Sequence, residues 1–194
     1  VGGSIAEAGR LADVLATIAN AKRPVVVVAG GGAFADKVRD LQNALRFDDA
    51  TAHRLAMLGM HQMAEVFVTT NGRFQITDRL DGISEVHEAG AIPVWVPLPS
   101  LQGDTSIPAD WSITSDGIGA RLAERLGGAP LALLKSCDVP QSVSASALSA
   151  AGIVDAAFPA IIARAKLAWQ IFGSGDDSAF EALLASDGQP SAKS

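Results

Sequence analysis

Two glycine-rich segments of this chain could bind phosphate groups. Gly2-Gly3-Ser4 precedes a predicted helix, and Gly30-Gly31-Gly32 lies between a predicted strand and the next helix. Free backbone N–H groups at a helix N-terminus attract anions, and glycine lets a phosphate approach the main chain closely. Two such loops heading two successive helices could hold two phosphoryl groups that face each other, which suits transfer from a donor to an acceptor. A lone glycine loop could equally be a tight turn without a ligand.

The second glycine segment also fits part of the dinucleotide-binding pattern G-x-G-x-x-A. Gly30, Gly32 and Ala35 occupy its fixed positions after a strand. That pattern requires a second strand that ends in an acidic residue about 20 positions later. Asp48 and Asp49 lie near this distance, but no apolar strand precedes them. Dinucleotide binding is therefore disfavoured, and the Walker sequence G-x-x-x-x-G-K-S/T does not occur.

Polar residues follow in the second half of the chain, at a helix start and after a strand. Thr114 or Ser115 could cap the helix, and Asp116 lies in its first turn, where the helix dipole favours an anion. Capping alone would explain these three residues. The run Lys135-Ser136-Cys137-Asp138 follows a buried strand, at the place where α/β folds bind ligands. Lys166 stands between a predicted helix and strand, and by itself fits a solvated lysine.

The elements that must position these residues alternate along the chain. Short apolar runs fit strands buried on both faces of a parallel sheet, and longer stretches with apolar stripes fit helices. This alternation predicts the α/β class, a three-layer α/β/α sandwich with a mainly parallel central sheet. The predicted strands are 24–29, 92–96, 131–134 and 167–172, and the predicted helices are 5–20, 34–45, 51–68, 115–126, 158–164 and 176–184. Residues 97–108 are predicted as a loop, and 142–151 as a surface loop or a weak helix.

Composition bounds the class of protein. The 194 residues are 48% hydrophobic, with 15 basic and 21 acidic side chains and a net charge of −6. Such a chain can bury a core but is poorly suited to binding a nucleic-acid backbone, which needs clustered cations. Cys137 is the one cysteine, so no internal disulfide can form. Since no membrane span or signal peptide is recognised, a cytoplasmic protein is expected.

The sequence predicts a single domain and disfavours a structural metal site. Residues 1–186 are expected to form one domain, with 187–194 as a flexible tail. His53 and His61 are eight positions apart and His87 lies elsewhere, a spacing that disfavours a structural metal site. Met57, Met60 and Met63 recur about once per helical turn, which favours packing in the core or between subunits.

In this order, the motifs resemble those of the amino acid kinase superfamily. The initial GGS loop, the strand followed by GGG, and the DWSITSD helix start (110–116) carry the likeness. Within that superfamily the chain is similar to the archaeal-type kinases of methanofuran biosynthesis, which are taken to phosphorylate an aminomethylfuran phosphate. GGGAFADKVR (30–39), AHRLAM (52–57), VDAAFP (154–159) and the later Lys166 carry this further likeness.

The resemblance implies an ATP- and Mg²⁺-dependent phosphotransferase with a small phosphorylated acceptor, usually as a homo-oligomer. Asp116 would orient catalytic lysines, and Lys166 would stabilise the transferring phosphoryl group. Little covalent work would fall to the protein, because positioning and charge neutralisation dominate such reactions. The nucleotide would contact Gly2, Gly3, Ser4, Thr114, Ser115, Lys135 and Asp138, and the acceptor Gly30, Gly31, Gly32, Phe34, Arg39 and His53.

Three departures from the family pattern concern catalysis and nucleotide choice. Relatives carry a lysine directly before the position of Val1. The glycine and hairpin that usually follow the run ending at Asp138 are replaced by Val-Pro-Gln and a Ser/Ala-rich stretch. Gly117 and Gly119 interrupt a helix start. A kinase of an amino acid carboxylate or of UMP, and a non-catalytic nucleotide-binding storage or regulatory subunit, therefore stay open as alternatives.

Overall fold

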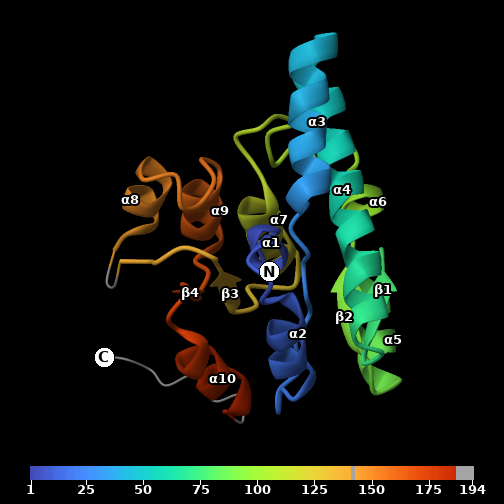
Figure 1. The fold of residues 1–194 in the computed structure, drawn as a ribbon, viewed down its shortest axis with the longest axis vertical. Coiled ribbons are helices and arrows are strands. Elements are labelled where there is room, and N and C mark those ends of the chain that lie inside the picture. Colours follow the sequence, from blue (N-terminus) through green and yellow to red (C-terminus); the bar gives the residue numbers. More distant parts are fainter. Residues whose placement is uncertain (141–142, 187–194) are drawn as a thin grey trace.

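Helices and short parallel strands alternate along the chain in the computed structural model, which describes residues 1–140 and 143–186 (Figure 1). The predicted tail, 187–194, lies outside the described residues. The elements in chain order are α1 Ser4–Glu7, α2 Leu11–Ala19, α3 Gly32–Leu45, α4 Asp49–Thr70, β1 Phe74–Thr77, α5 Leu80–Glu88, β2 Ile92–Trp95, α6 Leu98–Leu101, α7 Ser115–Arg125, β3 Leu131–Leu134, α8 Ala145–Ala150, α9 Phe158–Ala165, β4 Trp169–Phe172 and α10 Asp177–Ala185.

The strands form two parallel pairs, β1 with β2 and β3 with β4. Backbone hydrogen bonds of the intervening segments connect the pairs. Val27 bridges to β2, Gly30 N–H donates to Val1 O at 2.7 Å, and Gly2 N–H donates to Leu134 O of β3 at 3.3 Å. The predicted α/β class with parallel strands is confirmed, and the two glycine segments lie between the pairs.

The predicted strand 24–29 is present only as an isolated bridge. Val27 N–H donates to Pro93 O and Val27 O accepts from Trp95 N–H, both at 2.8 Å. Proline at position 93 has no N–H to continue this ladder. His87 Nε2 instead lies 2.9 Å from Val25 O, which can only accept, so this nitrogen is the donor. A proline and a histidine therefore end a strand that the apolar pattern predicted.

Other boundaries also differ from the predictions. The predicted helix 5–20 is two helices, α1 and α2, because the chain turns at Gly9 with φ +71°. Strand β1 and helix α5 were not predicted. A short helix, α6, lies within the predicted loop 97–108, and α8 is the weak helix considered for 142–151.

Helix α4 is the long support beside the first strand pair. Asp48 caps it by accepting from Thr51 N–H at 2.7 Å. Met57, Met60 and Met63 are 4%, 4% and 6% exposed, so the predicted core packing is confirmed.

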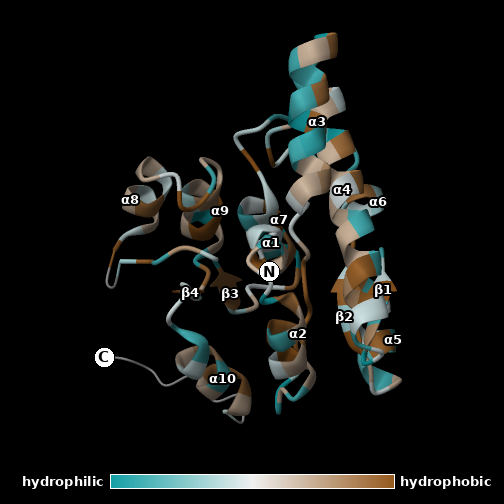
Figure 2. Cartoon of the chain, viewed as in Figure 1, coloured by the Kyte–Doolittle hydropathy of each residue, from teal (hydrophilic) through white to brown (hydrophobic). Residues whose placement is uncertain are grey.

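Figure 2 shows the strands as hydrophobic segments between helices of mixed polarity. None of the helices in residues 1–140 and 143–186 has the length and apolar character that a membrane crossing requires.

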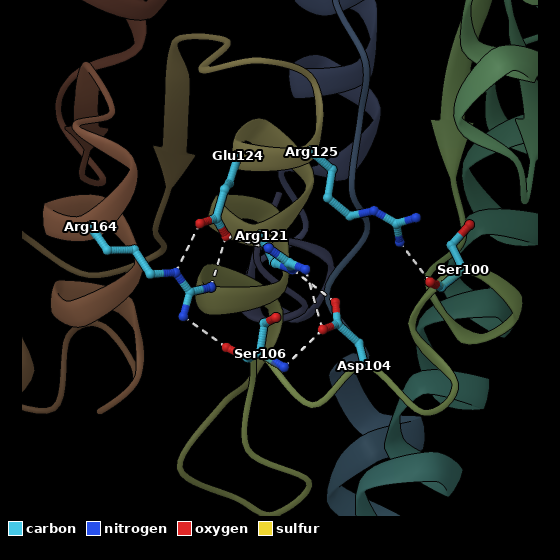
Figure 3. A network of polar contacts seen from close by, with 7 residues as sticks. All are labelled: Ser100, Asp104, Ser106, Arg121, Glu124, Arg125 and Arg164. Carbon is cyan, nitrogen blue, oxygen red and sulfur yellow. Dashed lines mark hydrogen bonds and ion pairs between the residues drawn. The ribbon is translucent and has the colours of Figure 1, made fainter.

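A network of ion pairs attaches the 100–106 segment to α7 and α9 (Figure 3). Arg121 donates to Asp104 and to Glu124, with nitrogen–oxygen distances of 2.8 and 2.6 Å. Arg164 donates twice to Glu124, at 2.8 and 2.7 Å, and once to Ser106 O at 2.7 Å. These bonds fix the packing of α7 against α9, and the N-terminus of α7 borders the candidate site described below.

We expect Glu124→Gln to lower the free energy of unfolding at pH 7 by ~1–3 kcal/mol. Hydrogen bonding from Arg164 lowers the pKa of Glu124 from 4.5 to about 2, assisted by Arg121 and opposed by burial. Because the pKa is lower in the folded state, the stabilisation is present above pH 4.5 and is lost as the pH falls towards 2. Urea unfolding of both proteins at pH 7, 4 and 3 measures this difference.

Glu88→Gln is the matched control, because Glu88 is exposed at the end of α5. Its effect is expected to stay within about 0.5 kcal/mol at each pH. A Glu124→Gln effect equally large at pH 7 and pH 3 would contradict the assignment.

Candidate functional site

The two glycine segments contact each other directly through their backbones. A Cβ atom added to Gly3 would lie 2.2 Å from Gly32 N and Cα, and one added to Gly30 would lie 2.4 Å from Gly3 N. Gly32 also has φ +51°, a conformation that favours glycine. No side chain fits between the segments at these positions. The sequence predicted two phosphate-binding loops that face each other, and the structure brings the two loops together.

A cavity of about 240 Å³ opens beside this contact. Its lining combines residues of both glycine loops and of the start of α7 with apolar side chains of α3, α4 and α7. Charged and aromatic residues complete the wall. The lining residues are Gly3, Ser4, Glu7, Gly31, Gly32, Ala35, Asp36, Arg39, His53, Ala56, Met57, Met60, Trp111, Ile113, Thr114, Ser115 and Ile118.

Helices α3 and α7 both begin at this cavity. No side chain caps the first turn of α3 in the described part of the chain, and Gly31 and Gly32 there line the cavity. The first N–H groups of a helix carry partial positive charge and have no partner within the helix. At the start of α3 the lining can therefore bind an anion such as a phosphate oxygen.

Asp155 holds the start of α7 in place. Its Oδ2 accepts from Thr114 N–H at 2.8 Å, from the Thr114 hydroxyl at 3.0 Å and from Gly117 N–H at 2.8 Å. Its Oδ1 accepts from Phe158 N–H at 2.9 Å at the start of α9. Burial raises the pKa of Asp155, and the bonds from Gly117 and Thr114 oppose that shift. The carboxylate thus connects the N-terminal turns of both helices.

Thr114, one of the two predicted candidates, is the N-cap residue of α7, but its hydroxyl donates to Asp155 and accepts no bond from its own helix. The position of Asp155 also explains the glycine after Asp116. A Cβ at Gly117 would lie 2.7 Å from Ile113 and 2.9 Å from Asp155 Oδ1. Asp155 was not predicted as a site residue, although an Asp three residues before a Phe-Pro helix start is a recognisable signal for a side chain that binds the first turn.

Asp116 and Lys135 form an ion pair of low exposure; neither lines the cavity, but Ser115, the residue before Asp116, does. Lys135 Nζ donates to Asp116 Oδ2 at 2.6 Å, and the side chains are 15% and 8% exposed. Asp116 comes from the first turn of α7, and Lys135 directly follows β3. The predicted pairing of Asp116 with a lysine therefore has a structural counterpart in Lys135. An ammonium group held by one carboxylate keeps two further N–H donors for other acceptors.

The predicted acceptor residues are only partly brought together. His53 is buried and lines the cavity, and burial lowers its pKa while Asp110 opposes the shift, so the imidazole is neutral at pH 7. Arg39 lines the same cavity. Phe34 is 38% exposed and does not line it, since its backbone packs over Gly59 of α4. The placement of Phe34 gives no support to its predicted role.

Lys166 lies near the amino end of β4. It is the residue after α9, with φ +50°, and two positions later Ala168 O accepts from Leu131 N–H at the start of β3. Lys135 and the glycine contact lie at the opposite, carboxyl end of β3. The expectation that Lys166 borders the gap with Asp116 is thus wrong in this structure. Lys135, the partner of Asp116, lies at the carboxyl end of the β3–β4 pair, and Lys166 lies at its amino end.

The remaining predicted nucleotide residues lie near the carboxyl ends of β3 and β4. Gly2 N–H binds Leu134 O, and a Cβ at Gly2 would lie 3.2 Å from that oxygen. Asp138 accepts a hydrogen bond from the Ser174 hydroxyl.

Within residues 1–140 and 143–186 no group of three or more His, Cys, Asp or Glu side chains could hold a metal ion.

Known proteins share sequence and fold features with this chain. The amino acid kinase family model matches residues 1–140. The chain is similar to the [5-(aminomethyl)furan-3-yl]methyl phosphate kinase of Methanocaldococcus jannaschii, with 28% identity over 104 residues. These residues make up 54% of this chain and 48% of that protein, so the match spans about half the length of the relative.

The fold is similar to the crystal structure of uridylate kinase from Archaeoglobus fulgidus. The TM-score is 0.62 over 89% of this chain and 86% of that one, at 14% sequence identity. At this identity the likeness shows the fold, and it supports the α/β arrangement described above.

Alanine substitutions at Gly3, in the glycine contact, and at Gly119, in α7, should change the free energy of unfolding in opposite directions. Gly3→Ala should lower the free energy of unfolding by ~1–3 kcal/mol, since the new methyl group overlaps the backbone of Gly32. Gly119→Ala should raise it by up to ~1 kcal/mol, because its Cβ would meet only Leu131 Cδ1 at 3.6 Å and alanine favours a helix. Thermal and urea unfolding measure both. A neutral Gly3→Ala variant would contradict the backbone contact.

Proposed function

The chain belongs to the amino acid kinase family, and from this premise we propose that it transfers a phosphoryl group from ATP to a small phosphorylated acceptor. One observation carries the proposal above the others. Two glycine loops in backbone contact and the first turn of α7 line one cavity, beside the Asp116–Lys135 ion pair. Such a surface offers backbone N–H groups and hydroxyls to phosphate oxygens, and the neighbouring ion pair adds one cation.

The residues present fit a nucleotide triphosphate. The absence of side chains at the glycines lets the two loops pack in direct backbone contact, so main-chain atoms form that part of the wall, and Ser4, Thr114 and Ser115 contribute hydroxyl groups to the lining. Lys135 would neutralise charge on the phosphoryl oxygens, while Asp116 holds the ammonium group in position. Bound Mg²⁺ would supply further charge neutralisation at the phosphates. Phosphoryl transfer needs mainly positioning and charge neutralisation, and these groups are of the chemical types that supply both.

We propose that the acceptor binds in the remaining part of the cavity, against Gly31, Gly32, Arg39 and His53. The volume of about 240 Å³ is below the ~300–1,000 Å³ of most ligand pockets, which favours a compact acceptor. An aminomethylfuran phosphate, the substrate in the name of the archaeal relative, has these properties. A cytoplasmic location and a homo-oligomeric state are proposed as well, and both stay predictions.

Asp116→Asn is expected to bind ATP with about wild-type affinity but to lose about 10²–10³-fold in turnover. The amide cannot hold the Lys135 ammonium group as the carboxylate does. ADP formation in the presence of ATP, Mg²⁺ and [5-(aminomethyl)furan-3-yl]methyl phosphate gives the turnover, and calorimetry gives the ATP affinity.

Asp13→Asn on the exposed face of α2 is the matched control and should keep wild-type turnover. Full activity of Asp116→Asn would remove Asp116 from the mechanism. Absence of ADP formation with this acceptor and with UMP, despite ATP binding, would favour the non-catalytic nucleotide-binding alternative.

A further inference from the structure

Trp111 has a set of contacts that the proposed phosphate chemistry does not use. Its side chain lines the cavity, and its indole Nε1–H donates to Gln42 Oε1 of α3 at 2.6 Å. The Arg39 guanidinium lies over the ring, 4.3 Å from the centroid. A hydrogen bond from the ring edge and a cation over the ring face together fix the orientation of an aromatic side chain.

Gln42 is itself fixed by its other contacts. Its Nε2 donates to Asp49 Oδ1 at 2.7 Å and to Phe47 O at 3.3 Å. Since a carboxylate and a carbonyl can only accept, and the indole N–H can only donate, these partners determine which end of the amide faces Trp111. Gln42 thus connects α3, the turn after it, the start of α4 and the Trp111 ring.

The backbone around Trp111 is anchored on the other side of the cavity. Ser112 N–H donates to Asp110 Oδ1 at 2.7 Å, and Ser112 O accepts from Ala157 N–H at 2.9 Å. Thr114 is bound by Asp155 as described above. The ring therefore extends from a segment fixed against α7 and α9 to a partner on α3, which makes it a fixed wall between these elements.

We propose that Trp111 is a specificity-determining residue, whose ring packs against a flat ring of the acceptor, and that Gln42 is the residue that positions it. This inference rests on the proposed function for the identity of the site. The cavity has phosphate-binding groups along one part, and Ala35, Met57, Met60 and Ile113 give it apolar surface. An acceptor that fits both parts carries an anionic group on a short arm attached to a small planar ring.

The experiment compares wild type with Trp111→Ala, Trp111→Phe and Gln42→Leu, and with Trp169→Phe as the matched control. Trp169 packs edge-on against Phe158, with ring centroids 5.5 Å apart, and does not line the cavity. Calorimetry measures the Kd of [5-(aminomethyl)furan-3-yl]methyl phosphate, of UMP and of ATP. Steady-state kinetics measures KM and kcat for the same compounds.

For the furan phosphate, Trp111→Ala should raise Kd and KM about tenfold or more, which corresponds to ~1.4 kcal/mol. Gln42→Leu and Trp111→Phe should raise them about 3- to 10-fold, since each removes the N–H···O bond and keeps an aromatic ring. The kcat at saturating acceptor and the Kd of ATP should stay unchanged. This difference between KM and kcat would not follow from a general loss of folding, and the two milder variants carry the test where Trp111→Ala does not fold.

Wild-type values of acceptor Kd and KM in Gln42→Leu and Trp111→Phe would overturn the inference even if turnover is high. Failure of the wild-type protein to bind the furan phosphate would also overturn it. Binding that is weakened by these substitutions in a protein without turnover would support the Trp111 wall and overturn the phosphotransfer proposal. An unchanged Trp111→Ala with normal turnover would leave the kinase proposal intact and remove Trp111 from acceptor recognition.

Discussion

The architecture of the site depends on one contact, the backbone-to-backbone packing of Gly3 against Gly32. A Cβ atom added to Gly3 would lie only 2.2 Å from the main chain of Gly32, so there is no space for even a methyl group. The contact lets helices α1 and α3 begin side by side, and it places the first turn of α3 on the wall of the cavity. Steric exclusion of all side chains is therefore what creates a surface of main-chain amides, and a phosphate-binding function becomes possible there.

Electrostatic contacts then fix the start of α7, which lines the same cavity as these loops. Asp155 binds the first turns of α7 and α9, and Asp116 in the former helix pairs with Lys135 at the end of β3. The two carboxylates do different work. Asp155 uses all its bonds on the backbone and the Thr114 hydroxyl, whereas Asp116 holds a cation that retains free donors. Asp155 thus supports the backbone, while Asp116 positions the ammonium group on which the proposed phosphotransfer relies.

Much of the site could be predicted from local sequence. A glycine triplet between an apolar strand and a helix, or Asp116 in the first turn of a helix, restricts the conformation of a few neighbouring residues, and these short-range preferences persist in the fold. The failures are equally informative. Lys166 was placed near Asp116 only through the resemblance. It precedes β4, and the parallel pairing of β4 with β3 puts it at the end opposite to Lys135. The predicted strand 24–29 does not form because Pro93, far along the chain, has no N–H for its ladder, and His87 binds Val25 O instead.

By itself, the sequence determined the α/β class, the glycine loops and the helix start at Asp116, because each is encoded by contiguous residues with strong local preferences. Only the tertiary structure decided which lysine meets Asp116 and that Asp155 supports two helices. It also decided that Trp111 meets Gln42, 69 positions away. Pairings of this kind depend on how separate elements pack, and no local preference of either partner specifies them.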